Sequence, residues 1–128
     1  MKINRFEDLE IWKNARELSK LAHDITSVEP FSRDFRFRDQ IRASVGSIAD
    51  NIAEGFERGG NKEFLQFLSI AKGSCGETRS QSYRAFDFGY ITKDVLNQLL
   101  DRTLVLSKQI SRFMAYLKTS SFKGPKYT

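Results

Sequence analysis

The fold is decided by residues 40–91, which read QIRASVGSIADNIAEGFERGGNKEFLQFLSIAKGSCGETRSQSYRAFDFGYI. Apolar residues recur at helical spacing on both sides of the breaker Arg58-Gly59-Gly60-Asn61, and Gly89 lies near the end of the stretch. A glycine just past a periodic segment is a typical stop signal for a helix. The stretch therefore predicts two long helices joined by a short turn.

Each of these helices has a stripe of core residues when its sequence is projected at about 100° per residue. In the first helix, predicted over about Arg36 to Phe56, the stripe consists of Phe37, Ile41, Val45, Ile48, Ile52 and Phe56. In the second helix, which ends before Gly89, it consists of Phe64, Leu68, Ala71, Cys75, Ser82 and Phe86. We expect both stripes to face one common core.

Both helices also carry a second face of small side chains. These residues are Ala43, Gly46, Ser47 and Ala53 in the first helix, and Ser69, Gly73 and Gly76 in the second. A glycine inside a helix costs roughly 1 kcal/mol against alanine, so two in one helix indicate a packing reason. Small side chains let another helix approach closely. The pattern favours an oligomer, and a monomer with two adapted faces is the open alternative.

Two flanking helices complete the predicted fold. The first runs from about Asp8 to Thr26, with a stripe of Ile11, Trp12, Ala15, Leu18, Ala22 and Ile25. The last begins after Thr92 as N-cap and continues to about Leu117, with a stripe of Val95, Leu99, Leu106, Ile110, Phe113 and Leu117. Leu100 and Leu104 lie outside this stripe, which makes them further candidates for a subunit contact. Four helices with short connections predict an all-α, antiparallel up-and-down four-helix bundle over residues 1–118, followed by a flexible basic tail over 119–128.

The net charge of +5 is concentrated at one end of the sequence. Residues 90–128 carry seven basic and two acidic residues, whereas the preceding 89 residues balance. A localised positive charge favours a polyanionic partner such as RNA or DNA, although a solvated basic helix end has the same composition. The candidate phosphate contacts are Arg102, Lys108, Arg112, Lys118, Lys123 and Lys126, assisted by Arg36 and Arg38.

Two further groups of residues have both a structural and a functional interpretation. Phe31, Phe35 and Phe37 alternate with arginines, and they either plug the end of the bundle or stack on single-stranded nucleic acid. The polar residues Gln40, Ser44, Asn51 and Glu54 border the core stripe of their helix. They form either a buried hydrogen-bond network that fixes the register of the helices or a small ligand pocket.

No residue pattern indicates catalysis or a cofactor. Cys75 is the single cysteine and falls in a predicted core stripe, and His23, the single histidine, has no metal ligand at suitable spacing on its face. No apolar run reaches the roughly 20 residues that span a bilayer, and the amino-terminal residues do not resemble a secretion signal. We expect a non-enzymatic cytoplasmic protein with no metal, no cofactor and no membrane contact.

Several motifs resemble a known bacterial family. They are Phe6-x-x-Leu9-x-x-Trp12-x-x-Ala15, Gln40-Ile41-Arg42-x5-Ile48-x-x-Asn51-Ile52-Ala53-Glu54-Gly55, Lys62-Glu63-Phe64-x-x-Phe67-Leu68-x-Ile70-Ala71-x-Gly73-Ser74, and Gly89-Tyr90-Ile91. Together they are similar to the four-helix bundle proteins encoded by intervening sequences in bacterial 23S rRNA genes. The chain departs from that pattern at Ala49, where the family usually has proline, and at Cys75 and Thr78, where it usually has leucine.

The resemblance implies properties that the residues alone do not give. It implies a homopentamer and a kinship with the accessory variability determinant of diversity-generating retroelements, a pentamer that binds nucleic acid and a reverse transcriptase. The expected function is therefore a non-enzymatic, oligomeric nucleic-acid-binding accessory protein. A scaffold that docks a partner enzyme such as a reverse transcriptase, through Leu100, Leu104 or the Phe31–Phe37 loop, is the alternative.

Overall fold

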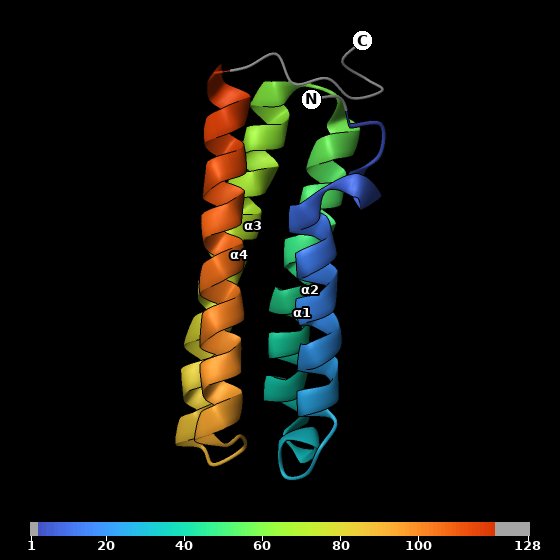
Figure 1. Cartoon of the computed structure of the whole chain (residues 1–128). Coiled ribbons are helices and arrows are strands. Elements are labelled where there is room, and N and C mark those ends of the chain that lie inside the picture. The colour runs from blue at the N-terminus through green and yellow to red at the C-terminus, as the bar shows by residue number, and fades with distance from the viewer. Residues whose placement is uncertain (1–2, 120–128) are drawn as a thin grey trace.

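The computed structural model describes residues 3–119 and has the predicted architecture (Figure 1). Four long helices run alternately up and down, and two short 3-10 turns precede the first two of them. The elements are η1 (Phe6–Asp8), α1 (Glu10–Thr26), η2 (Phe31–Arg33), α2 (Phe35–Arg58), α3 (Asn61–Asp87) and α4 (Lys93–Thr119). The prediction of an all-α antiparallel four-helix bundle is confirmed.

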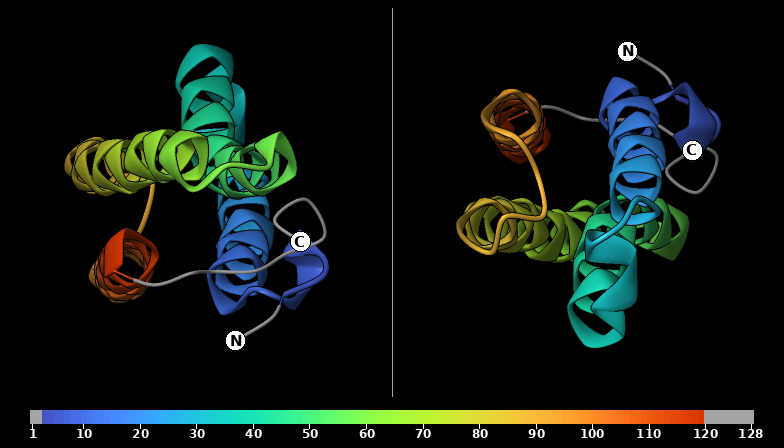
Figure 2. Two further views of the ribbon diagram at one scale, coloured as in Figure 1. Left: turned by 90° about the horizontal axis from the view of Figure 1, so that it is seen from above. Right: turned by 90° about the horizontal axis from the view of Figure 1, so that it is seen from below.

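The helices are visibly tilted against one another when the bundle is seen from its ends (Figure 2). In these views α4 has α3 as its neighbour on one side and α1 across from it on the other. None of the helices within residues 3–119 combines the length and apolar character that crossing a bilayer requires.

Local capping sets the ends of the helices. The Asp34 carboxylate accepts a hydrogen bond of 3.2 Å from the Phe37 N–H, so α2 begins one residue earlier than predicted. It ends at Arg58, and the C-cap residue Gly59 has a φ of 94°, a left-handed conformation that favours glycine. Thr92 is the N-cap of α4, as predicted, because its hydroxyl accepts from the Val95 N–H at 3.2 Å. The α2 helix is continuous across Ala49, where the resemblance implies a proline.

The core stripe predicted for α2 is buried along its whole length. The α3 stripe is buried from Phe64 to Ser82, but the prediction that Phe86 joins it is wrong: Phe86 is 36% exposed, and its ring lies 5.3 Å from the Lys93 ammonium. Ala85, the residue before it, occupies the core position in the last turn of α3. In α4 the buried face also includes Leu96 and Thr103, which the predicted stripe leaves out.

Aromatic residues close the end of the bundle that contains η2 and the connection between α3 and α4; these two segments lie at the bottom of Figure 1. Phe31 and Phe37 are buried and stack with their ring centroids 5.2 Å apart, and Tyr90 lies 5.1 Å from Phe31. Tyr90 also donates a hydrogen bond of 2.8 Å to Asp34. The structural interpretation of this loop is therefore confirmed for Phe31 and Phe37, whereas Phe35 is 64% exposed.

Gly55 allows a close approach between α2 and α3. A Cβ atom at this position would lie 2.6 Å from Phe67 Cβ and 2.9 Å from Phe64 Cδ1. Both distances are shorter than van der Waals contact, so a larger residue would push the two helices apart.

A ladder of polar side chains joins α2 to α3 next to the core. The Ser44 hydroxyl lies 2.6 Å from Gln81 Oε1 and 3.0 Å from Thr78 Oγ1, and all three residues are buried. One turn further along α2, Ser47 and Ser74 share a hydrogen bond of 3.0 Å. Buried polar groups of this kind must be paired, so the ladder fixes the register of the two helices.

The predicted network around α2 is therefore confirmed in part. Ser44 belongs to it, and Asn51 extends it by donating hydrogen bonds of 2.8 Å to the carbonyl and hydroxyl oxygens of Ser47. Glu54 does not belong to it, because this exposed residue pairs with Arg58 at 3.1 Å. Gln40 is exposed and lines a groove over the ladder instead.

Candidate nucleic-acid interface

The basic residues of α4 are exposed, and their charges are available to an external anion. Arg102, Lys108, Arg112 and Lys118 form no ion pair with any carboxylate within the described residues, although Asp101 is the direct neighbour of Arg102. By contrast, most basic residues in the first half of the chain are paired, for example Lys13 with Glu10 at 3.6 Å. Within the described part of the chain, the basic residues of α4 are thus also the less paired ones.

Arg102 and Arg112 lie along the groove between α1 and α4. Arg112 lines a pocket of about 370 Å³ in this groove, and Arg102 lines a second one of about 180 Å³. A hydrogen bond of 2.8 Å from Asn14 to Gln109 crosses the groove, and Gln109 lines both pockets. Within one chain this groove places two of the predicted phosphate contacts along one line.

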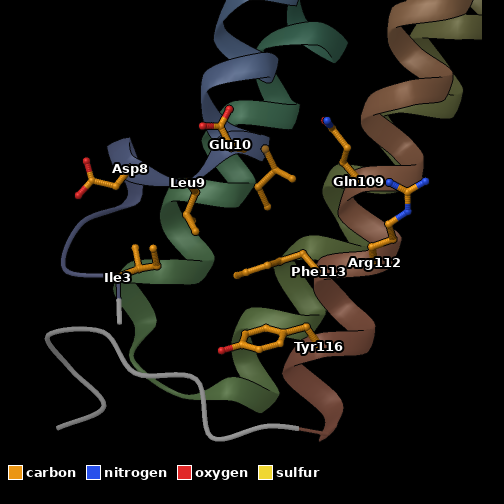
Figure 3. A pocket seen from close by; sticks show the side chains of 9 residues that line it. Ile3, Asp8, Leu9, Glu10, Gln109, Arg112, Phe113 and Tyr116 are labelled. Atoms are coloured by element: carbon orange, nitrogen blue, oxygen red, sulfur yellow. The ribbon is translucent and has the colours of Figure 1, made fainter. Parts of the chain in front are cut away.

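The walls of the larger pocket are mostly apolar (Figure 3). Phe113 and Tyr116 extend from α4 toward Ile3 and Leu9, while Gln109 and Arg112 lie on the α4 side above them. Carboxylates also line both pockets: Asp8 and Glu10 in the larger one, and Glu17 and Asp101 in the smaller one. The groove therefore has mixed charge and is not a continuous cationic channel.

The remaining predicted phosphate contacts are spread over the bundle. Lys108 lines neither pocket, and Lys118 lies in the last turn of α4. Arg36 lies in the first turn of α2, at the opposite end of the molecule, and is exposed without an ion pair among residues 3–119. Thr119, the first residue of the predicted tail, belongs to α4 instead, and Lys123 and Lys126 lie with residues 120–128 outside the described residues. Among the described residues, one chain does not bring the predicted contacts together.

Arg38 has structural partners within its own chain. Its guanidinium lies over the Phe35 ring at 5.0 Å, pairs with Asp39 at 3.0 Å and donates to the Ser32 carbonyl at 3.3 Å. Its side chain is only 24% exposed. These contacts stabilise the start of α2 and leave Arg38 less available than Arg36 to a phosphate.

The small-residue faces lie on more than one side of the bundle. Ala43 and Ser47 line the groove between α2 and α3, together with Ser80 of α3, whereas Gly46 lines the groove between α1 and α2. Ala53 and Gly76 are partly exposed, and Ser69 and Gly73 are exposed. A Cβ atom at Gly46, Gly73 or Gly76 would meet nothing within 4 Å, so packing inside the described chain does not require glycine there.

Apolar side chains accompany these faces. Tyr83 is 51% exposed and lies two heptads after Ser69, on the same side of α3 as Gly76. On α4, Leu104 and Val105 are 42% and 47% exposed, whereas Leu100 is partly buried against the core. The sequence prediction missed Tyr83, although its seven-residue spacing from Gly76 is visible in the sequence.

Cys75 and His23 are in different surroundings. Cys75 is fully buried, and this burial raises the pKa of its thiol from 9.0 to about 11 despite the nearby charges of Arg79 and Lys72. The thiol is therefore protonated near neutral pH and is a poor nucleophile. His23 is 66% exposed beside Asp24, and residues 3–119 contain no group of three side chains suited to hold a metal ion.

The comparison with protein families identifies the chain. The family model described as 23S rRNA-intervening sequence protein matches residues 7–112, which include α1, α2, α3 and most of α4. A comparison with curated proteins gives no match. The family match covers most of the chain, and the fold agrees with the resemblance noted in its motifs. The chain belongs to the 23S rRNA-intervening sequence protein family.

Proposed function

We propose that this chain is a non-enzymatic, oligomeric accessory protein that binds RNA or DNA through phosphate contacts. The observation that supports this proposal is the set of exposed cations on α4, Arg102, Lys108, Arg112 and Lys118, which have no ion pair among residues 3–119. Exposed cations of this kind release counterions from a nucleic acid and bind it without reading its sequence.

Assembly would bring the scattered cations together. Five copies would carry a formal charge of 5 × 5 = +25, and each cation would recur around the ring. The number five comes from the family resemblance. The face of α3 with Ser69, Gly73, Gly76 and Tyr83 is a suitable subunit contact, because it is exposed and leaves room for a neighbouring helix.

The subunit contact is tested by placing long side chains on this face. A Cβ atom at Gly73 or Gly76 meets nothing within 4 Å, and both residues lie at the surface of α3, so Gly73→Gln with Gly76→Gln should leave the subunit folded with improved helix propensity. The assembly should fail, because the longer side chains fill the space that a neighbouring helix would occupy. Light scattering should then give a smaller mass, while circular dichroism stays helical. An unchanged mass would place the subunit contact elsewhere.

The binding proposal is tested by charge reversal on α4. Lys108→Glu with Arg112→Glu should weaken binding of single-stranded RNA. It should also lower the slope of log K against log salt by about 1.4 per engaged subunit, since each phosphate contact contributes about 0.7. The matched control is Arg33→Glu with Arg58→Glu, which changes the charge equally at sites already paired with Glu29 and Glu54.

Two outcomes would refute this proposal. If wild-type protein binds neither structured RNA nor single strands at low salt, the proposed function is wrong. If the α4 variant and the control weaken binding equally, only the net charge matters and α4 is not the contact surface.

A scaffold that docks a partner enzyme, such as a reverse transcriptase, is the second candidate. The exposed apolar side chains of Leu104 and Val105 on α4 favour it, because exposed apolar surface is typical of protein interaction sites. Leu104→Asp should then abolish partner capture, whereas the Lys108 and Arg112 reversals should leave it intact.

A further inference from the structure

The groove between α1 and α2 combines an aromatic ring with two cations and a histidine. The two helices lie side by side (Figure 1), and the groove has a volume of about 410 Å³, within the size range of small-ligand sites. The lining residues that matter here are Trp12, Arg16, Lys20 and His23 of α1 and Gly46 and Asp50 of α2.

Trp12 and Arg16 form a preorganised stack on the α1 side. The Arg16 guanidinium lies over the Trp12 ring, 5.8 Å from its centroid, and the Phe6 ring supports the indole edge-on at 5.2 Å. Arg16 is exposed and has no ion pair among residues 3–119. A guanidinium plane held in this way offers both a stacking surface for a base and hydrogen-bond donors for a phosphate.

Arg16, Lys20 and His23 are spaced by four and three residues, so they follow one another along one face of α1 over about 10 Å. Lys20 pairs with Glu17 at 3.7 Å and His23 lies 3.8 Å from Asp24. These contacts are exposed and therefore weak, so a phosphate can replace them at small cost. The row follows the direction that a bound strand would take.

The α2 wall is open and carries one acceptor. Gly46 has no side chain, and a Cβ atom there would meet nothing within 4 Å. Asp50 is exposed and forms no ion pair within the described residues. A carboxylate accepts hydrogen bonds from the amino or hydroxyl groups of a nucleoside but repels a phosphate. The wall therefore fits a base or a sugar, and the α1 wall fits a phosphate.

We propose that this groove binds one nucleotide unit of a single-stranded nucleic acid. The base stacks on the Arg16–Trp12 pair, and the adjoining phosphate contacts Lys20 and His23. The Asp50 carboxylate accepts a hydrogen bond from the nucleoside. This site rests on the proposed function, but it is a separate surface from α4 and uses stacking in addition to charge.

Trp12 is the single tryptophan and lines this groove, so the tryptophan fluorescence of the protein comes from this one residue. Titration of wild-type protein at low salt with ten-nucleotide RNA and DNA strands should quench the emission saturably. The comparison of the two strands shows whether the 2′-hydroxyl contributes. Arg16→Gln with Lys20→Gln should raise the Kd obtained from the quenching titration about tenfold. This is the effect of losing one stacked base with its phosphate. The control is Lys13→Gln, which changes an exposed, paired lysine of the same helix. Its Kd should stay within about twofold of the wild-type value.

A second variant tests the groove without changing its charge. Gly46→Leu adds a side chain to an open wall and improves helix propensity, so the fold should persist while the nucleotide is excluded. Retained quenching in Gly46→Leu, with mass and helicity unchanged, would overturn the proposed site. So would equal quenching by poly-glutamate, which would indicate an acidic peptide surface.

Failure of the site and failure of the proposed function give different results. RNA that shifts in a gel without quenching Trp12 overturns the groove and leaves the α4 surface in place. RNA that neither shifts nor quenches overturns both. Quenching that survives the Lys108 and Arg112 reversals, with gel affinity reduced, is the result expected if both surfaces act.

Discussion

Replacing Gly55 with alanine should destabilise the bundle, although the same substitution elsewhere in α2 should stabilise it. The added Cβ atom would lie 2.6 Å from Phe67 Cβ, and this neighbour cannot rotate away because it is fixed to the backbone of α3. Overpacking of this kind costs about 1 to 3 kcal/mol, and a contact with an immobile atom belongs in the upper part of that range. Alanine gains about 1 kcal/mol of helix propensity over glycine, which leaves a net loss of about 1 to 2 kcal/mol.

Gly46→Ala is the matched control, since it has the same gain in propensity and meets nothing within 4 Å. Urea unfolding followed by circular dichroism measures both variants, and the difference between their free energies of unfolding isolates the steric term. We expect Gly55→Ala to be less stable than Gly46→Ala by about 2 to 3 kcal/mol. Equal stability of the two variants would refute the close approach of α2 and α3 at this position.

The other predictions concern Tyr90, Cys75 and Leu104. The hydrogen bond to Asp34 raises the pKa of Tyr90 above 10.0, so its stabilisation is complete below that value and is lost as the pH rises through the folded-state pKa. Tyr90→Phe should therefore lower the melting temperature at pH 8. The difference in melting temperature between the variant and wild type should become smaller at strongly alkaline pH. A difference that does not change with pH would contradict the role of the Tyr90 hydroxyl proton. Ellman's reagent should modify Cys75 slowly at pH 8 and in step with urea unfolding, because the buried thiol has a pKa of about 11; rapid labelling of folded protein would contradict its burial. Leu104→Asp should leave the melting temperature within a few degrees, since the side chain is 42% exposed; a large loss would mean that an assembled neighbour covers it.

The sequence predicts the helices and most of the core because both follow from periodicity. All six stripe residues predicted for α2 are buried, since one face of a long amphipathic helix must face the core. Helix ends are less predictable. α1 begins at Glu10, two residues later than predicted, because Asp8 belongs to the turn η1, and the Asp34 cap starts α2 one residue early. The prediction that Phe86 is a core residue is wrong because the final turn of α3 places Ala85 inward. Which residue faces inward there depends on the neighbouring helices.

The role of each glycine could not be read from the sequence. Gly55 lies opposite Phe67, whereas Gly46 and Gly73 face open space. Only the tertiary structure distinguishes Gly55 from these two glycines. Nothing in their local sequence indicates which residue lies across from them.

The tertiary neighbours of the candidate site residues also could not be predicted from the sequence. A charge count finds the surplus after residue 90, but it does not show that Arg102 and Arg112 share a groove with carboxylates or that Arg38 is held by Phe35 and Asp39. The cations of one described chain do not form a single surface. For this reason the proposed activity depends on assembly.

The most direct test of this dependence is the mass of the wild-type protein in dilute solution, measured by light scattering. We predict a multiple of the 14.8 kDa chain, and 5 × 14.8 = 74 kDa for the pentamer. A mass of 14.8 kDa at the concentrations where RNA binds would contradict the account, because no assembled cationic surface would then exist.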